Sequence, residues 1–381
     1  MSKIQKVLII PDSFKDSISA IEFCDIAKDA VLNFNPKIHI ESIPMADGGE
    51  GSIDVFRYIN GYRYKTVRVK DPLGKNINAE YCIQKKTGTA MIEMAKASGL
   101  QMIPVSHRNP MKTSSFGTGQ LILDAINSSA EKIILFIGGT ATNDIGVGML
   151  EALGFKFYND DGELVLGQVK NIPRVVKIES PGLINRLQEI SFVVACDVSN
   201  KLLGPKGATY TYGKQKGASE EQIKTLESYF RHFSQVVTKN SYTDYSNAEG
   251  SGAAGGIGFS SMTFLNAKYK SGFEVISEFL DLENHINLNS YDLIITGEGK
   301  IDTQTSSGKL LMQLGHFGEK NSIPILAFGG AVEGNLEELK LQGITELVQI
   351  SPEGQPIEDA IKKTSINLKA AISKKIREYL N

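Results

Sequence analysis

The residues best suited to chemistry lie within residues 291–309, where an apolar run turns abruptly polar. Residues 293–296 have the length and β-branched content of a buried strand. Two carboxylates, Glu298 and Asp302, follow among glycines, a lysine and hydroxyls. Because open α/β proteins bind ligands where a buried parallel strand ends in such a loop, we expect a site here rather than a simple helix cap.

Five loops share this design, in which an apolar strand is followed by glycines mixed with acidic, amide, hydroxyl or lysine side chains. They span residues 11–15, 46–52, 138–146, 197–207 and 297–305. Glycine lets backbone N–H groups approach an anion, carboxylates hold Mg²⁺, and lysine neutralises phosphate. Phosphoryl transfer needs these parts, so we expect the loops to converge on a cleft between two domains.

Motifs for other nucleotide chemistry are missing. The chain contains no GxxxxGK[ST] phosphate-binding loop. Residues 250–255 match GxGxxG, but the preceding residues 242–249 are polar and do not predict a β-strand. We therefore interpret this stretch as a place of close helix packing or backbone approach, not as a dinucleotide fingerprint. The five histidines lie in ordinary settings, which disfavours a histidine-driven mechanism.

The composition is that of a soluble globular protein. A chain of 381 residues is too long for one ordinary core, so two domains are expected. A net charge of −2 gives no footprint for nucleic acid, and no apolar run approaches the ~20 residues that cross a membrane. The N-terminus lacks a signal peptide, so a cytoplasmic protein is expected. Three scattered cysteines have no metal or redox spacing, and Cys24 and Cys196 read as buried.

The elements that must position these loops alternate as strand and helix at both ends of the chain, and less regularly between. Two helices, beginning after Ser19 and Ser219, start with capping-box spacing. The pattern predicts an α/β fold with two domains. Residues 1–60 and 289–381 would form one doubly wound parallel sheet, and residues 61–288 an inserted α/β domain with a mixed sheet.

Nine segments resemble the signature segments of class I glycerate kinases. They are PDSFKDSISA (11–20), PMADGGEGS (44–52), IEMAKASGL (92–100), SSFGTG (114–119), GGTATNDIGVGML (138–150), ACDVSNKLLGPKGA (195–208), YGKQKGA (212–218), GSGAAGGIGF (250–259) and TGEGKIDTQT (296–305). The resemblance runs in order over most of the chain. It implies ATP-dependent phosphorylation of a glycerate hydroxyl, usually to 2-phosphoglycerate, with Mg²⁺. It also implies two α/β domains around a cleft, one of them similar to flavodoxin or Rossmann folds.

A few positions depart from the family pattern. Asp16 stands where glycine is usual, Lys214 where proline is usual, and Lys300 where arginine is usual, while Ser306 and Ser307 replace a larger residue. None of these changes removes a candidate carboxylate or lysine.

The resemblance assigns expected roles to the loop residues. Lys15 is expected to face substrate or phosphate, and Asp47, Asp197, Glu298 and Asp302 to supply the catalytic base. Asp47, Glu298 and Asp302 are also the candidate Mg²⁺ ligands, and which carboxylate does which task stays open. Further candidates for binding substrate or phosphate are Ser13, Gly48, Gly49, Glu50, Gly139, Thr140, Asn143, Asp144, Lys206, Lys216, Gly297, Gly299 and Thr305.

Two other functions compete with glycerate phosphorylation. One is a kinase or phosphatase of another small hydroxy acid, and the other is a non-catalytic sensor of hydroxy acids or nucleotides. A dehydrogenase is disfavoured because no strand precedes the GxGxxG stretch. The expected partners are glycerate and ATP, with no nucleic acid and no membrane, and the chain is expected to be a monomer or a homodimer.

Overall fold

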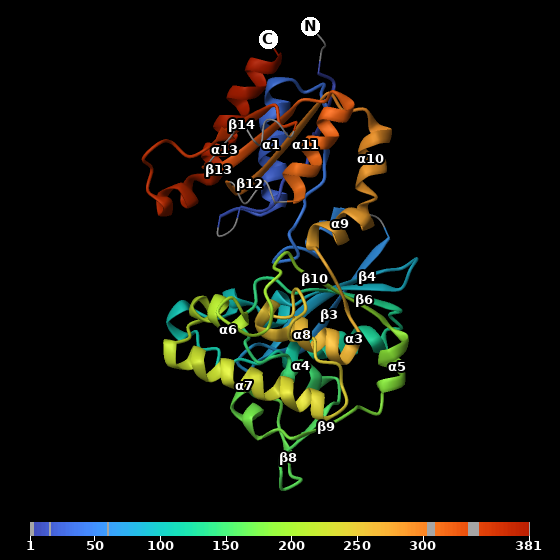
Figure 1. The fold of residues 1–381 in the computed structure, drawn as a ribbon. Coiled ribbons are helices and arrows are strands. Elements are labelled where there is room, and N and C mark those ends of the chain that lie inside the picture. The colour runs from blue at the N-terminus through green and yellow to red at the C-terminus, as the bar shows by residue number, and fades with distance from the viewer. Residues whose placement is uncertain (1–3, 15–16, 59–60, 303–308, 334–342, 381) are drawn as a thin grey trace. The chain divides into compact units, whose positions relative to one another are not determined.

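The computed structural model describes residues 4–14, 17–58, 61–302, 309–333 and 343–380. The chain folds into two compact units, of which the first combines Met1–Ala46 with Phe273–Asn381 and the second is Asp47–Gly272. Figure 1 colours the chain along its length, so the first unit contains its blue and its orange-to-red segments. The domain boundaries near residues 60 and 288 that the sequence suggests stay a prediction.

The first unit contains a five-stranded parallel sheet, as predicted. In chain order its strands are β1 (Lys6–Ile9), β2 (His39–Ser42), β12 (Leu293–Ile301), β13 (Ile325–Val332) and β14 (Glu346–Gln349). Their order across the sheet is β14-β13-β12-β1-β2, which is the flavodoxin-like order of a doubly wound fold. The helices of this unit are α1 (Ala20–Phe34), α9 (Gly272–Leu280, whose first residue belongs to the second unit), α10 (Leu282–Asn289), α11 (Lys309–Asn321) and α13 (Ile357–Leu380).

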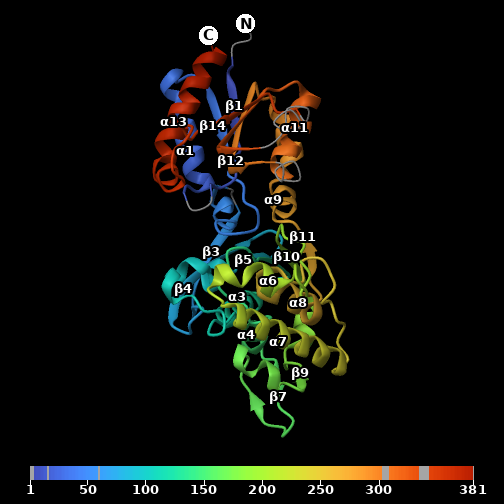
Figure 2. The ribbon, with the colours of Figure 1, turned by 60° about the vertical axis from the view of Figure 1, so that its left-hand side comes forward.

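Helices cover both faces of this sheet, because its strands are apolar on both sides. Figure 2 shows α1 and α13 on one face and α11 on the other. Val7 and Ile9 pack with Phe23 of α1 and Leu368 of α13 in one buried cluster. The predicted capping box at the start of α1 is confirmed, since Ser19 Oγ accepts from Glu22 N at 3.2 Å and the Glu22 carboxylate accepts from Ser19 N at 2.8 Å.

Strand β12 is longer than the sequence indicates. The prediction of a loop that begins at Gly297 is wrong, because β12 continues to Ile301 and pairs in register with β13. Glycine at this position allows close packing in the strand: a Cβ on Gly297 would lie 2.4 Å from the Phe328 carbonyl oxygen and 2.8 Å from the Phe23 ring. Glu298 is therefore a strand residue, and Asp302 follows the end of the strand.

The second unit contains a six-stranded mixed sheet, also as predicted. Its order is β11-β10-β6-β5-β4-β3, in which β5, β6, β10 and β11 run parallel and β3, β4 and β5 pair antiparallel. These strands are β3 (Tyr62–Lys70), β4 (Asn76–Gln84), β5 (Thr89–Glu93), β6 (Lys132–Phe136), β10 (Ser191–Ala195) and β11 (Lys268–Lys270). A small antiparallel sheet consists of β7 (Lys156–Tyr158), β8 (Leu164–Val165) and β9 (Lys177–Glu179).

The helices α3, α4, α7 and α8 lie together on one side of the six-stranded sheet in Figure 1. Leu121, Leu150, Phe230 and Ile257 of these helices belong to one buried apolar cluster that also includes residues of the strands. The helices of this unit are α2 (Ala95–Ser98), α3 (Phe116–Asn127), α4 (Val147–Ala152), α5 (Ile184–Glu189), α6 (Ala208–Tyr212), α7 (Glu220–Lys239) and α8 (Ala253–Leu265), with short 3₁₀ helices that include η1 (Asp54–Tyr58) and η5 (Lys214–Lys216).

The GxGxxG stretch packs closely against neighbouring backbone, as expected. Gly255 and Gly256 at the start of α8 have φ values of +68° and +92°. A Cβ on Gly255 would lie 2.3 Å from the Thr142 carbonyl oxygen, and one on Gly252 would lie 2.2 Å from the Lys201 carbonyl oxygen. Only glycine combines a positive φ with no Cβ to clash with the neighbouring backbone, so the motif here serves packing. Within the described residues, no helix is long and apolar enough to cross a membrane.

Candidate functional site

Three parallel strands of the second unit end at the same edge of its sheet. Glu93 of β5 pairs with Phe136 of β6, and Phe136 pairs with Ala195 of β10. Parallel strands place the segments after them at one edge, where α/β proteins bind ligands. The loop of residues 138–146 and the segment that begins at Asp197 both start there.

The loop of residues 47–52 packs against the same edge. Gly138 N donates to Gly48 O at 3.0 Å. Gly48 has a φ of +89°, and a Cβ there would lie 3.0 Å from the Ala195 carbonyl oxygen. Asp47 Oδ1 accepts from Gly49 N at 2.9 Å, and Asp197 Oδ1 accepts from Gly272 N at 3.1 Å, so backbone amides orient both carboxylates. Three of the five predicted loops are therefore neighbours within one unit.

Lys216 reaches the loop of residues 138–146 from η5. Its side chain is buried, and Nζ donates to Thr142 O at 2.6 Å and to Thr140 Oγ1 at 3.4 Å. Burial lowers the pKa of the Lys216 ammonium to about 8, while the nearby Asp144 carboxylate opposes that shift. Buried groups with such shifted pKa values cluster at functional sites, which favours Lys216 as a site residue. Lys206, by contrast, is exposed, and its carbonyl accepts from Asn200 Nδ2 at 2.7 Å.

Asp144 and Asn143 lie buried in this loop and differ in their partners. The Asp144 carboxylate accepts from Ser115 N at 2.7 Å, from Ser115 Oγ at 2.8 Å and from Gly146 N at 3.2 Å. Burial raises the pKa of Asp144, and these hydrogen bonds oppose the shift. Its contacts hold the loop together, and its contact with substrate stays a prediction. The Asn143 amide has no hydrogen-bond partner among the residues described here, so it suits a bound water or ligand group.

Glu93 is a candidate site residue that the sequence analysis missed. It ends β5, its side chain is fully buried, and Oε2 accepts from Ile53 N at 3.3 Å. The Gly51 amide also acts on this carboxyl, and within the described part of the chain Oε1 has no hydrogen bond of ordinary geometry. Burial raises the pKa of Glu93 to about 7, against the opposing charge of Lys96. A glutamate at the end of an otherwise apolar strand was the available signal.

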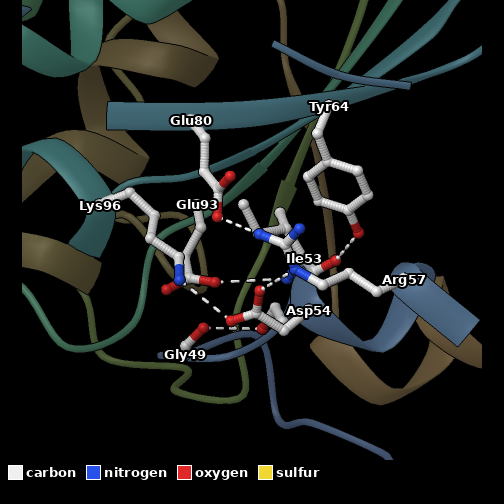
Figure 3. A network of polar contacts seen from close by, with 9 residues as sticks. Gly49, Ile53, Asp54, Arg57, Tyr64, Glu80, Glu93 and Lys96 are labelled. Atoms are coloured by element: carbon white, nitrogen blue, oxygen red, sulfur yellow. Dashed lines mark hydrogen bonds and ion pairs between the residues drawn. The ribbon is translucent and has the colours of Figure 1, made fainter. Parts of the chain in front are cut away.

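A network of polar side chains fixes the surroundings of Glu93 (Figure 3). Lys96 Nζ lies 3.0 Å from Asp54 Oδ2, and Asp54 Oδ1 accepts from Arg57 Nε at 2.9 Å. Arg57 also pairs with Glu80 of β4. Burial opposes ionisation of Asp54, but Arg57 and Lys96 hold the pKa of its carboxyl below the ordinary value. The network therefore keeps a lysine and an ionised aspartate beside the buried glutamate.

An open cavity of about 380 Å³ lies next to this network. Glu93 and Lys96 form part of its wall together with Glu50 and Gly139, two residues predicted to bind substrate. This volume is at the lower end of the range of small-molecule sites.

The first unit presents its own candidate residues at the carboxyl ends of β1 and β12. These neighbouring strands mark the point where strand order reverses, which is where such sheets bind ligands. Asp12 N donates to Gly297 O at 2.9 Å, and Ser13 N donates to Asp12 Oδ1 at 2.6 Å. Glu298 is half-buried there. Lys15 and Thr305 lie outside the described residues.

The carboxylates of the first unit fit a magnesium ion by their chemistry. Mg²⁺ takes hard oxygen ligands, commonly one or two carboxylates completed by substrate phosphates and water. In the described ranges, no cluster of three or more His, Cys, Asp or Glu is placed to hold a metal. Asp302 Oδ2 lies 3.2 Å from Lys300 Nζ, and Lys300 Nζ lies 2.9 Å from Glu333 Oε2, so a cation at Asp302 would compete with Lys300.

Comparisons with known proteins agree over nearly the whole chain. Residues 7–380 match the model of the glycerate kinase family. A glycerate kinase of Bacillus cereus is 38% identical over 95% of both chains, and a glycerate 2-kinase of Escherichia coli is 37% identical over 95% of both. A crystal structure from Salmonella typhimurium, described as a candidate glycerate kinase 2, has a TM-score of 0.79 and 33% identity, and covers 99% of this chain and 98% of its own.

Proposed function

The chain belongs to the glycerate kinase family, whose members transfer phosphate to an alcohol group, and we propose that it phosphorylates D-glycerate to 2-phosphoglycerate with ATP and Mg²⁺. The observation that best supports this proposal is the carboxyl edge of the second unit. There two glycine-rich loops place Asp47 and Asp197 at one sheet, and the buried Lys216 of η5 donates to the third loop at Thr142 O. Carboxylates and a cation at such an edge are what a small anionic alcohol needs for binding and proton transfer.

We assign the roles by unit. In the second unit, Asp47 and Asp197 would orient the reacting hydroxyl, and Lys216 with Thr140 and Asn143 would bind anionic oxygens. In the first unit, Lys15 would contact phosphate, and Glu298 and Asp302 would hold Mg²⁺. A bound Mg²⁺ ion would neutralise charge on the transferred phosphoryl group.

The test is ADP release from purified protein with ATP, Mg²⁺ and D-glycerate, followed by phosphorus NMR of the product. We expect turnover only when all three are present, and a product phosphorylated at the 2-hydroxyl. Asp197→Asn should lower kcat by about 100-fold or more if this carboxylate acts on the hydroxyl. Asp160→Asn, at an exposed aspartate between β7 and β8, is the matched control and should leave kcat unchanged.

The same assay separates the competing functions. Turnover with another hydroxy acid but not with glycerate would keep the kinase and reject the substrate. Binding of glycerate or ATP with no turnover across a hydroxy-acid panel would favour a sensor instead.

A further inference from the structure

Glu93 combines three features that no structural role requires together. Its carboxyl is buried, the backbone amides of Ile53 (3.3 Å to Oε2) and Gly51 act on it, and Oε1 has no hydrogen bond of ordinary geometry in the described part of the protein. A buried polar atom without a partner costs free energy unless a ligand or water meets it. Figure 3 shows one carboxyl oxygen toward Ile53 and the other on the side of Lys96.

The surroundings of Glu93 indicate what kind of ligand would meet Oε1. The cavity of about 380 Å³ has Glu93, Lys96 and Glu50 in its wall, together with the amide side chains of Asn78 and Gln101. Its acidic groups exclude a polyanion, while Lys96 and the amides suit a single carboxylate. A carboxylate oxygen beside them suits a hydroxyl donor. These groups fit a small hydroxy acid.

We propose that this cavity binds the hydroxy-acid substrate and that Glu93 Oε1 accepts the proton of its reacting hydroxyl. The inference rests on the proposed phosphoryl transfer but changes one assignment. Glu93, which lies outside the five predicted loops, takes the place of Asp47 and Asp197 at the reacting hydroxyl, because neither aspartate is part of the cavity wall. The hydroxyl oxygen forms a bond to the γ-phosphorus of the nucleoside triphosphate while the bond from that phosphorus to the diphosphate oxygen breaks. The hydroxyl proton passes to Glu93, which later returns it to water.

The charged groups around Glu93 are compatible with this task. Burial and the charge of Asp54 from η1 favour the neutral carboxyl, whereas Lys96 from α2 and the backbone amides of Gly51 and Ile53 favour the ionised form. The balance holds the pKa of Glu93 at about 7, so at neutral pH a large fraction of Glu93 can accept a proton. Glu80 of β4 acts on Lys96 rather than on Glu93, and Glu50 lines the cavity from its loop.

The first test compares Glu93→Gln with Glu151→Gln. The latter changes a half-buried glutamate of the same unit that also accepts from a backbone amide, Gly167 N at 3.1 Å, but lies outside the cavity wall. Glutamine at residue 93 can still accept from Ile53 N but cannot take a proton. We expect kcat to fall by about 100-fold or more with KM changed little, and the acid limb of the wild-type kcat profile near pH 7 to disappear. A residual activity within threefold of wild type that keeps this limb would overturn the proposal.

The second test needs neither turnover nor a change at Glu93. Asn78→Trp places a ring at an exposed strand position on the cavity wall, where aromatic residues are well tolerated. Calorimetry with D-glycerate alone should show Kd raised by about tenfold or more in this variant and unchanged in Glu151→Gln. Unchanged glycerate affinity in Asn78→Trp, or no glycerate binding by the wild-type protein, would overturn the cavity as the substrate site. Glycerate binding that Asn78→Trp weakens, together with no turnover by wild type, would instead reject the proposed phosphoryl transfer.

Discussion

Two buried side chains of the second unit have pKa values displaced toward neutrality from opposite sides. Burial lowers the pKa of Lys216 from 10.5 to about 8 and raises that of Glu93 from 4.5 to about 7. Each displacement means that the charged form of the side chain is destabilised in the folded protein. An apolar residue used only for packing would carry no such penalty. Both residues lie beside loops with glycines and carboxylates, so their pKa values suit chemistry more than stability.

The Lys216 displacement predicts a pH-dependent cost to stability. Between pH 8 and 10.5 the unfolded chain binds more protons at this lysine than the folded chain, so stability rises with pH in that window. Below pH 8, Lys216 is charged in both the folded and the unfolded chain, so the full destabilisation by its buried charge is present. Lys216→Met removes it, so the stability difference between variant and wild type should shift by about 3 kcal/mol in favour of wild type from pH 8 to 10.5. Urea unfolding at several pH values measures this, with the exposed Lys224→Met as reference. A constant difference would contradict it.

Glu93 predicts the opposite pH dependence. Between pH 4.5 and 7 the folded chain binds more protons at Glu93 than the unfolded chain, so its contribution to stability is lost as pH rises through this window. Relative to Glu93→Gln, wild type should lose about 3 kcal/mol of unfolding free energy from pH 4.5 to 7. Denaturant unfolding across that range checks the slope, and the exposed Glu131→Gln variant corrects for effects shared by the whole chain. Parallel curves for wild type and Glu93→Gln would rule out a buried, displaced carboxyl.

At the scale of elements, local patterns predicted most strands and helix starts. The capping boxes at Ser19 and Ser219 and both sheets are confirmed, because capping and apolar periodicity act within a few residues. The extension of β12 to Ile301 could not be predicted from glycine-rich sequence, since pairing with β13 overrides the weak strand preference of Gly297. Glu93 was missed for a related reason: its cavity forms only when β5 meets the loop of residues 47–52 and α2.

Close contact between two glycine loops predicts which small residues the site needs. A Cβ on Gly138 would lie 2.4 Å from Gly49 Cα, so Gly138→Ala must push apart the loops of residues 47–52 and 138–146. We expect a loss of about 1–3 kcal/mol in stability and at least about tenfold in kcat/KM. Gly182→Ala, where a Cβ would meet nothing within 4 Å, should change neither. Thermal unfolding and steady-state kinetics on both variants check the contrast, and equal behaviour would show that the loops adjust freely.

At the scale of the whole molecule, one unit is inserted into the other. The ends of the second unit meet, because a Cβ on Gly272 would lie 2.3 Å from the backbone of Asp47. Adjacent ends are typical of an inserted domain that can fold alone. The alternation of strands and helices predicts such an insertion. The boundaries expected near residues 60 and 288 rest on the change in sequence pattern alone, which does not report the contacts made by residues 47–58.

Those residues make contacts that predict where the second unit can be cut. Ile53, Val55 and Phe56 are buried, Ile53 N donates to Glu93, and Tyr64 Oη donates to Ile53 O at 2.6 Å. A fragment of residues 47–272 should therefore unfold cooperatively in urea, with the Glu93-linked slope between pH 4.5 and 7 intact. A fragment of residues 61–288 loses the large buried apolar side chains of Ile53 and Phe56. It should be several kcal/mol less stable, since each such loss costs about 2–5 kcal/mol. Circular dichroism and urea titration of both fragments decide between the two boundaries. Equal unfolding free energies would place the boundary near residue 60. A clearly lower unfolding free energy for the fragment of residues 61–288 would place it near residue 46.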